Sequence, residues 1–534
     1  MTDNTDTRLR TECIWDLVEA RAEATPDAQF AVDEHRRSFS FADFRRLAEG
    51  IAATLYERGV RAGDVVSWQL PTTVEGMAIA LALTRLGAVQ NPLVMMLRGP
   101  EIGFIADQLD TSMLIVRKEF RGFDHATMAE RVAATRPGMK VLAIGDSVPL
   151  GDPAILPARQ DSPSSARFGP DISWILYTSG TTSAPKGVKH TDRSLLAAAA
   201  TFTDNVRPTP EDRCAALIPL GHVGGIGHLL HALEMGHTLL VGATFVPEET
   251  TDFLIEQGVT LVGSGLPFTN EYLRISRERG VAPLFPHARA VLMGGAGRPR
   301  TLHRDAKERL GGVGVISGYG MTECPYATWG RPEDSELQHA EFEGVPGIGG
   351  EIRIVDANDR RLPSGEIGEI RLRAPQLFVG YVDSSLDADA FDDDGFFRTG
   401  DLGRLDSDGC VCVTGRIKDI IVRKMENISA REVEEALIGH PAIAEVSVIG
   451  VPDKDSGERV CAVVVPVDAD TQLTLETVRE FLLTTDLNVR RFPEQVEVLD
   501  ALPRNALGKI IKPDLRKRFV DDADTNEEDG DGHE

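Results

Sequence analysis

The chain has 534 residues, of which 42% are hydrophobic and 26% are charged, as in ordinary globular proteins. This length exceeds what one compact core fills, so we expect two or more domains. The formal net charge of −26 argues against binding to nucleic acid or to an anionic membrane surface, because both carry negative charge themselves.

Targeting and redox signals point to the cytoplasm. The N-terminal sequence lacks the basic-then-apolar pattern of a secretory signal. The longest apolar run, about residues 77–89, contains Arg85 and falls short of the roughly 18 residues of a membrane span, so it predicts a core helix. The six cysteines are scattered, and we interpret Cys410 and Cys412 as packing residues, in keeping with a reducing compartment.

The first 300 residues alternate between helix and strand patterns. Residues 40–43 form a capping box, and apolar residues follow it at helical spacing as far as Leu55. Residues 64–70 then read as a strand. Such alternation predicts an α/β fold in which helices cover largely parallel sheets.

The pattern changes near residue 350. Residues 351–355 and 366–372 predict paired strands of a small β-rich subdomain, and strands at 446–451 and 459–465 predict a separate unit. The chain is therefore expected to have a large N-terminal domain of layered sheets and helices (1–415) with that subdomain. A small, mobile α+β domain (416–519) and an acidic, disordered tail (520–534) complete the prediction.

The most informative segment is YTSGTTSAPKGV, residues 177–188, which follows the apolar strand 172–177. Small residues let the backbone approach a phosphate, hydroxyls donate hydrogen bonds, and Lys186 supplies a point charge. The segment is not a Walker A loop, because Pro185 precedes the lysine and Gly187 follows it. The alternative is a flexible surface loop.

This segment closely resembles the phosphate-binding loop of the adenylate-forming superfamily, which contains acyl-CoA synthetases, luciferases and peptide-synthetase adenylation domains. Ser183 stands where most members have glycine. The resemblance implies that the loop contacts the phosphates of ATP through Thr178, Ser179, Gly180, Thr181, Thr182 and Lys186.

A second matching segment is SGYGMTE, residues 317–323. The resemblance implies that Tyr319 stacks on adenine, Thr322 contacts phosphate and Glu323 binds Mg²⁺; a turn with a solvated acid is the alternative. Many relatives have Gln in place of Ser317. The implied nucleotide wall also includes Gly318, Gly320, Gly294, Gly295 and Ala296.

Three further segments match in the expected order. In FRTGDLG (397–403) and GRIKD (415–419), the resemblance implies that Asp401 accepts both ribose hydroxyls, that Arg416 fixes ribose and phosphate, and that Lys418 is the interdomain hinge. In LPRNALGKI (502–510), Lys509 corresponds to the lysine that reaches the α-phosphate and the carboxylate. An ordinary turn and a solvated lysine are the alternatives.

The acyl pocket is the least readable region. PLGHVGGIG (219–227) resembles the segment at the pocket mouth, where His222 either gates the acid or only satisfies local hydrogen bonds. Small residues predict room for a bulky acid, and the resemblance implies a pocket lined by His222, Gly224, Gly265, Gly318 and Met321. Segments 87–92 and 118–125 resemble the branch of cyclohexanecarboxylate and medium-chain acyl-CoA ligases.

Together these motifs predict an ATP- and Mg²⁺-dependent acyl-CoA synthetase that forms acyl-AMP and then transfers the acyl group to coenzyme A. One departure concerns CoA access: Arg423, Lys424 and Met425 stand where relatives have a glycine pair. Transfer to another acceptor, such as a carrier protein, therefore stays open, as does a non-catalytic nucleotide sensor. The acid remains open among medium-chain fatty, alicyclic, aryl and steroid side-chain carboxylates, and a homodimer is not excluded.

Overall fold

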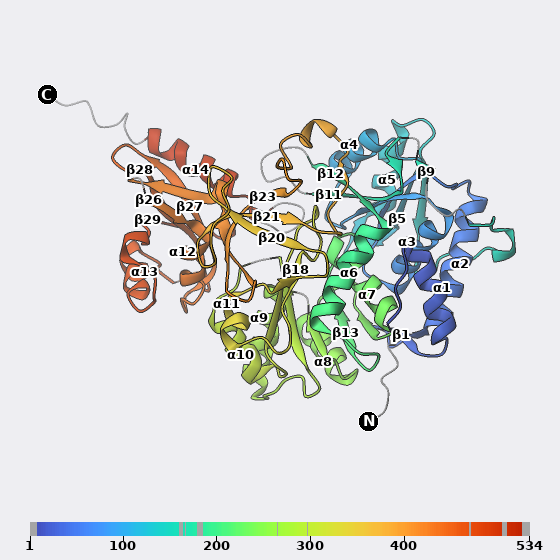
Figure 1. Cartoon of the computed structure of the whole chain (residues 1–534), viewed down its shortest axis with the longest axis horizontal. Coiled ribbons are helices and arrows are strands. Elements are labelled where there is room, and N and C mark those ends of the chain that lie inside the picture. The colour runs from blue at the N-terminus through green and yellow to red at the C-terminus, as the bar shows by residue number, and fades with distance from the viewer. Residues whose placement is uncertain are drawn as a thin grey trace.

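A computed structural model describes residues 8–159, 164–165, 167–178, 185–263, 265–295, 297–424, 426–468, 471–504 and 510–525. The protein has a large N-terminal part, in which sheets and helices are layered, and a smaller C-terminal part (Figure 1). Among the described residues, no helix has the length and apolar character that crossing a membrane requires.

The first large sheet has seven strands. Its central strands run parallel, and β12 and β22 complete one edge in antiparallel fashion. Its strands, in spatial order, are β22 (Gly380–Tyr381), β12 (Lys186–Thr191), β11 (Ile172–Thr178), β4 (Val89–Leu93), β3 (Val65–Gln69), β5 (Met113–Arg117) and β8 (Lys140–Ile144).

The second large sheet has nine strands, parallel in the middle and antiparallel at both ends. In spatial order they are β19 (Val345–Pro346), β18 (Thr328–Trp329), β17 (Val315–Tyr319), β16 (Ala290–Gly294), β15 (Leu261–Gly263), β13 (Arg213–Ala216), β14 (Thr238–Val241), β1 (Gln29–Asp33) and β2 (Ser38–Ser40). The predicted, largely parallel α/β architecture is therefore confirmed.

One hydrophobic core joins the two sheets. It contains Trp68 and Trp174 of the first sheet, Leu239 and Leu292 of the second, and apolar residues of the helices between them. The N-terminal helices are α1 (Ile14–Ala24), α2 (Phe41–Glu57), α3 (Val74–Leu86), α4 (Gly99–Leu109), α5 (His125–Ala134), α6 (Asp192–Val206), α7 (Val223–Met235), α8 (Pro247–Glu256), α9 (Leu266–Arg279), α10 (Thr301–Arg309) and α11 (Glu336–Glu341).

The predicted β-rich subdomain is an antiparallel sheet of four strands: β20 (Glu351–Val355), β21 (Gly368–Arg373), β23 (Phe397–Leu405) and β24 (Val411–Arg416). Shorter elements are β6 (Glu119–Phe120), β7 (Phe123–Asp124), β9 (Ser164–Ser165), β10 (Gly169–Pro170) and the 3-10 turns η1 (Pro153–Ile155), η2 (Ser384–Leu386), η3 (Ile417–Asp419) and η4 (Val489–Arg491).

The C-terminal sheet has its own apolar core. It consists of β26 (Glu426–Ser429), β25 (Ile420–Arg423), β28 (Gly457–Pro466), β27 (Ile443–Asp453) and β29 (Gln495–Val498), with helices α12 (Ala430–Leu437), α13 (Leu475–Leu482) and α14 (Lys512–Thr525). The sheets change at η3, close to the domain boundary expected after residue 415, which stays a prediction.

One expectation about the C-terminus was wrong. Helix α14 continues to Thr525, so residues 520–525, assigned to a disordered tail, are helical. Composition alone missed this because adding residues to a helix that has already formed is far easier than starting one. Residues 526–534 lie outside the described residues.

Candidate nucleotide and acyl site

Tyr319, Asp401 and Arg416 meet where β17 and the four-stranded sheet approach each other. The Tyr319 hydroxyl donates to Asp401 Oδ2 at 2.7 Å, and Arg416 Nε lies 2.8 Å from Asp401 Oδ1. Asp401 pairs with Arg416 in the antiparallel register of β23 and β24. Burial, followed by the nearby Asp401 carboxylate, raises the pKa of Tyr319. The predicted ribose-binding acid is thus held rigidly while its carboxylate keeps capacity to accept further hydrogen bonds.

Glu323, the predicted metal ligand, is held by a tyrosine that the motifs did not reveal. Tyr381 donates its hydroxyl to Glu323 Oε1 at 2.9 Å, and the Lys186 ammonium lies 5.3 Å from the centre of the Tyr381 ring. Burial and the neighbouring Glu323 raise the pKa of Tyr381. Tyr381 therefore links the lysine of the phosphate loop to the predicted Mg²⁺ ligand. Tyr381 and Glu323 are 58 residues apart in sequence.

A second residue missed by motif analysis supports Thr322. His190 of β12 is fully buried, with Nε2 2.8 Å from the Thr322 carbonyl oxygen and Nδ1 2.9 Å from the Ser194 hydroxyl. Burial lowers the pKa of His190 to about 4. The imidazole is therefore neutral near pH 7, and it donates from Nε2, because a carbonyl oxygen only accepts. This contact fixes the backbone just before Glu323.

Ser317, where relatives have glutamine, belongs to a buried ionic network. Its hydroxyl accepts from Arg298 Nη1 at 2.9 Å, and the same nitrogen lies 3.0 Å from Glu343 Oε1. Arg431 of α12 reaches the same Glu343 oxygen at 3.5 Å. The short serine side chain therefore anchors an arginine that ties the strand of the predicted adenine wall to the C-terminal part.

Several predicted residues lie outside the described residues: Ser179, Gly180, Thr181, Thr182, Ala296, Met425 and Lys509. Thr178 ends β11 and is paired with Lys186 across the β11–β12 ladder, so both ends of the phosphate loop start from one point. Gly294 pairs with Gly318 between β16 and β17, Gly295 adopts a left-handed φ of 78°, and Gly320 follows β17. The nucleotide contacts of these residues stay predictions.

Two glycines of the predicted acyl region, Gly227 and Gly318, lie against aromatic rings of the protein, and the expectation of room for a bulky acid stays a prediction. A Cβ atom at Gly227 would lie 2.5 Å from the Tyr326 ring, and one at Gly318 would lie 2.8 Å from the Trp329 ring. Tyr326 also donates its hydroxyl to the Gly224 carbonyl oxygen at 3.0 Å. These small residues accommodate aromatic rings of the protein itself, whereas a Cβ at Gly265 would meet no atom within 4 Å.

His222 and Met321 are the remaining predicted acyl residues. His222 is the N-cap of α7, and its Nδ1 accepts from the Gly224 backbone N–H at 3.1 Å, so the local hydrogen-bonding role is present. Met321 packs against the apolar clusters of the four-stranded sheet and around Phe378. A gating role for His222 and an acyl contact for Met321 stay predictions.

The predicted hinge lies in η3, between the four-stranded and the five-stranded sheets. Burial and the nearby Arg416 lower the pKa of Lys418, whose carbonyl oxygen accepts from Arg516 of α14 at 3.4 Å. In the β25–β26 hairpin, Lys424 has a left-handed φ of 48°. This turn thus keeps the conformation that favours glycine, although a lysine occupies it.

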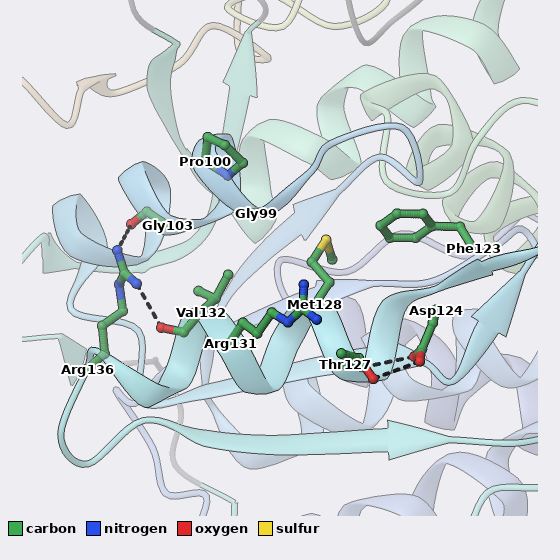
Figure 2. Close-up of a pocket in the computed structure, with 10 residues that line it drawn as sticks. All are labelled: Gly99, Pro100, Gly103, Phe123, Asp124, Thr127, Met128, Arg131, Val132 and Arg136. Carbon is green, nitrogen blue, oxygen red and sulfur yellow. Dashed lines mark hydrogen bonds between the residues drawn. The ribbon is translucent and has the colours of Figure 1, made fainter.

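A groove of about 680 Å³ lies elsewhere, between α4 and α5 (Figure 2). Arg136 bridges the two helices by donating to the Gly103 and Val132 carbonyl oxygens at 2.9 and 2.7 Å. Asp124, at the end of segment 118–125, caps α5 through the Thr127 N–H. The groove contains none of the residues predicted to bind nucleotide or acid.

Comparisons with known proteins agree with this geometry. The "AMP-binding enzyme" family model matches residues 18–382, and the "AMP-binding enzyme C-terminal domain" model matches residues 432–509. The chain is 31% identical to a medium-chain fatty-acid–CoA ligase of Escherichia coli, over 95% of this chain and 90% of that protein. It is also 31% identical to a salicylyl-CoA synthase / salicylate adenylyltransferase of Streptomyces, over 95% and 93%.

Among solved structures, ATP-bound MatB of Rhodopseudomonas palustris matches with a TM-score of 0.82 at 27% identity, covering 95% of this chain and 99% of that one. The chain belongs to the family of AMP-binding enzymes, the adenylate-forming superfamily that its motifs resemble. It is an enzyme of the AMP-forming acid–CoA ligase class, as the sequence predicted.

Proposed function

We propose that this protein is an ATP-dependent acyl-CoA synthetase. It activates a carboxylic acid to acyl-AMP with release of pyrophosphate, then transfers the acyl group to CoA with release of AMP. The observation that supports this most directly is the convergence of Tyr319, Asp401 and Arg416 beside the group formed by Lys186, Tyr381 and Glu323. The first set suits a nucleoside, and the second suits phosphates with a divalent cation.

The donor set fits Mg²⁺. Among the described residues, the Glu323 carboxylate accepts one hydrogen bond, from Tyr381 at Oε1, which leaves its other oxygen as the hard ligand that this cation prefers. When bound, Mg²⁺ neutralises phosphate charge. Lys186 adds a positive charge at the start of β12, and Tyr381 keeps both side chains in place. Orientation and charge neutralisation carry most of the first step.

The second step requires a change of arrangement about Lys418. By resemblance, Lys509 offsets charge at the α-phosphate during adenylation, and rotation of the small domain then removes it and opens a path for CoA. The position of η3 between two sheets with separate cores supports this hinge.

The six cysteines are all free thiols, which supports the expected reducing cytoplasm.

We further propose that the substrate is a medium-chain, alicyclic or other bulky acid. The names of similar proteins, a medium-chain fatty-acid–CoA ligase and an indoleacetate–CoA ligase, support acids of this size. The alternative is delivery to an acceptor other than CoA, such as a carrier protein. This alternative is supported by Lys424 and Met425, which stand where relatives have glycines. The adenylyltransferase name of the Streptomyces relative supports it as well.

The test is mass spectrometry of the full chain with Mg·ATP and a panel of acids, with and without CoA. Joint appearance of acyl-CoA and AMP is expected. Acyl-AMP that accumulates in spite of CoA would favour the alternative acceptor, and absence of AMP with every acid would contradict the proposal.

A matched pair of lysine variants tests the mechanism. Lys509→Ala should abolish acyl-AMP formation but still convert supplied acyl-AMP to thioester. Lys512→Ala is the control, because Lys512 forms an ion pair with Glu434 at 2.8 Å. Equal loss of both half-reactions in Lys509→Ala would contradict the assigned role.

A further inference from the structure

Three histidines form a buried cluster beside the predicted acyl pocket. His228 and His231 lie on α7, and His237 precedes β14; we call them the histidine cluster. Their rings follow one another with centroid separations of 5.2 and 4.9 Å, and His231 Nδ1 lies 3.0 Å from His237 Nε2. All three are buried.

Aromatic contacts join the histidine cluster to Tyr326 and Trp329, the rings that lie against Gly227 and Gly318. Phe202 stacks on His231 at 4.2 Å and also contacts Trp329 at 5.0 Å and Tyr326 at 6.2 Å. Tyr326 is the ring that covers Gly227, the residue directly before His228. The cluster therefore lies behind the tyrosine that occupies the predicted acyl region.

Four buried nitrogens in this region have no hydrogen-bond partner among the described residues: His228 Nδ1, His231 Nε2, His237 Nδ1 and Trp329 Nε1. Buried polar atoms in native proteins are nearly always paired, and leaving one unpaired carries a substantial free-energy cost. Their concentration in one contiguous aromatic cluster leaves several donors and acceptors there that a bound polar group could pair with.

The chemistry of these nitrogens defines the group they fit. His231 and His237 share one proton between Nδ1 and Nε2, so whichever ring donates, one of the two outer nitrogens carries a hydrogen and the other a lone pair. Trp329 Nε1 only donates. A ketone or hydroxyl oxygen therefore always finds a donor, and a hydroxyl also finds an acceptor.

The cluster is uncharged near neutral pH. Burial lowers the pKa of His228 to about 4 and that of His237 to about 3, and it lowers that of His231 as well. The adjacent cation, Arg21 of α1, also opposes protonation of His237, and burial keeps Cys214 of β13 a neutral thiol by raising its pKa. A second carboxylate would meet no counter-charge from the imidazoles, whereas a neutral oxygen group is compatible with them.

We propose that the histidine cluster and Trp329 form the far end of the acyl site and select an acid with a neutral oxygen function, a ketone or hydroxyl, remote from its carboxyl group. This inference rests on the proposed function. To reach the cluster, the acid displaces the Tyr326 ring from Gly227.

A bound metal ion is the competing explanation. Ligand atoms of Cys214, His231 and His237 lie within 4.8 Å of one another, and thiolate with imidazole suits zinc or copper. The organic oxygen is favoured because two of these ligands already share a hydrogen bond. It also accounts for the unpartnered Trp329 N–H, which cannot coordinate a metal.

The test compares matched acids with the full chain: cyclohexanecarboxylate with its 4-oxo derivative, and a two-ring acid with and without a remote ring ketone. The measured quantity is kcat/KM for AMP formation with Mg·ATP and CoA. We expect at least a tenfold preference for the oxo acids, because their absence leaves buried polar groups unpaired. Equal use, or preference for the deoxy acids, overturns the inference while leaving the synthetase intact. No AMP with any acid overturns the proposed function instead.

Variants assign the preference to the cluster. Trp329→Phe and His228→Leu should each reduce the oxo/deoxy ratio at least threefold while the deoxy acids are still used. Tyr272→Phe is the control, because it removes from a separate core a buried hydroxyl that also has no partner among the described residues, and it should leave the ratio unchanged. A ratio unchanged in both cluster variants contradicts the assignment.

Two measurements on the unaltered chain guard against variants that fail to fold. The oxo acids should raise its thermal unfolding temperature more than the deoxy acids do; equal shifts count against the inference. Elemental analysis should find no zinc or copper at one atom per chain. Stoichiometric metal that is lost in Cys214→Ser overturns the proposal in favour of a metal site.

Discussion

Two buried polar clusters flank β18, and they differ in charge and in how completely their polar atoms are hydrogen-bonded. Thr328 donates its hydroxyl to the Glu343 carbonyl oxygen within the network of Arg298, Glu343 and Arg431, whereas its neighbour Trp329 contacts the histidine cluster through Phe202. The first cluster is ionic, with its charges opposed and both Arg298 amino groups bonded; within the part of the chain that the structure describes, Arg298 Nε is the atom of this cluster without a partner. The second is neutral, and four of its nitrogens have no partner among the residues that the structure describes.

The difference distinguishes buried polar groups that stabilise the fold from buried polar groups that are available to bind a ligand. A buried charge must be matched within the protein, because removing one partner leaves the other uncompensated. A buried neutral nitrogen can instead form its hydrogen bond with a bound ligand, because leaving it unpaired costs less free energy than leaving a charge unpaired. Degree of burial therefore does not distinguish the two clusters, but hydrogen-bond completeness does.

The largest expected effect comes from breaking the ionic network. Glu343→Gln removes the counter-charge of the buried Arg298, while Arg431 keeps Glu435 at 2.7 Å, and it should lower the free energy of unfolding by about 3–5 kcal/mol. Urea unfolding followed by circular dichroism measures this. Glu336→Gln, which weakens the contacts of the exposed Glu336 carboxylate to His303 and Lys307, is the control and should change little. Equal effects of the two changes would remove the distinction between the clusters.

Lowering the pH should destabilise the folded protein through the neutral histidine cluster. The folded protein holds His228 and His237 with pKa values of about 4 and about 3, below the ordinary value of 6.5, so the unfolded chain binds more protons between these limits. Stability from these groups is complete above pH 6.5 and is lost as the pH falls toward 4. His125 and His190, also lowered to about 4, add to the effect.

The measurement is the free energy of unfolding in urea from pH 7 to 4. His237→Gln should reduce its slope by at most about 1.4 kcal/mol per pH unit, the contribution of one proton. An unchanged slope would mean that His237 is already protonated or solvated in the folded state.

On the nucleotide side, Tyr381→Phe removes the hydrogen bond to Glu323. A hydrogen bond to a charged group contributes about 1.5–3 kcal/mol, so KM for Mg·ATP should rise by about tenfold or more while KM for the acid stays constant. Tyr56→Phe on α2 serves as the matched control. A change in KM for the acid alone would contradict the prediction, because it would assign Tyr381 to acid binding and not to nucleotide binding.

The smallest effect is expected on the acyl side. Tyr326→Phe removes the bond to the Gly224 carbonyl oxygen, which contributes about 1 kcal/mol, and keeps the ring over Gly227. The ring should leave its place more readily, so KM for a bulky acid should fall a few-fold with KM for ATP unchanged. A rise in KM for the acid would show instead that the hydroxyl binds the substrate.

What could be predicted from the sequence was local. The capping box of Ser40 and Asp43 is present at the start of α2 because both partners lie within one turn. Motifs likewise identified Tyr319, Asp401 and Arg416, since each lies in a short string of distinctive residues. The resemblance assigned each of them to one nucleotide, whereas the hydrogen bond and ion pair among them were not predicted.

The rest depended on long-range packing. Tyr381 reaches Glu323, and His190 reaches Thr322, only through strand pairing across distant segments. In the sequence, His228 and His231 are ordinary positions on a helix. The surroundings of the glycines depended on the same packing: absence of a side chain was visible in the sequence, but the aromatic rings beside Gly227 and Gly318 were not.

The pairing of glycine with an aromatic ring has a consequence for the evolution of specificity. At Gly227 and Gly318, the backbone is already shaped to accept something as large as an indole or a phenol. One codon change that shortens Tyr326 or Trp329 therefore releases a ring-sized space without any movement of α7 or β17. Descendants of this enzyme can acquire larger acids in single steps, and laboratory selection for new substrates should find its first gains at these two aromatic positions.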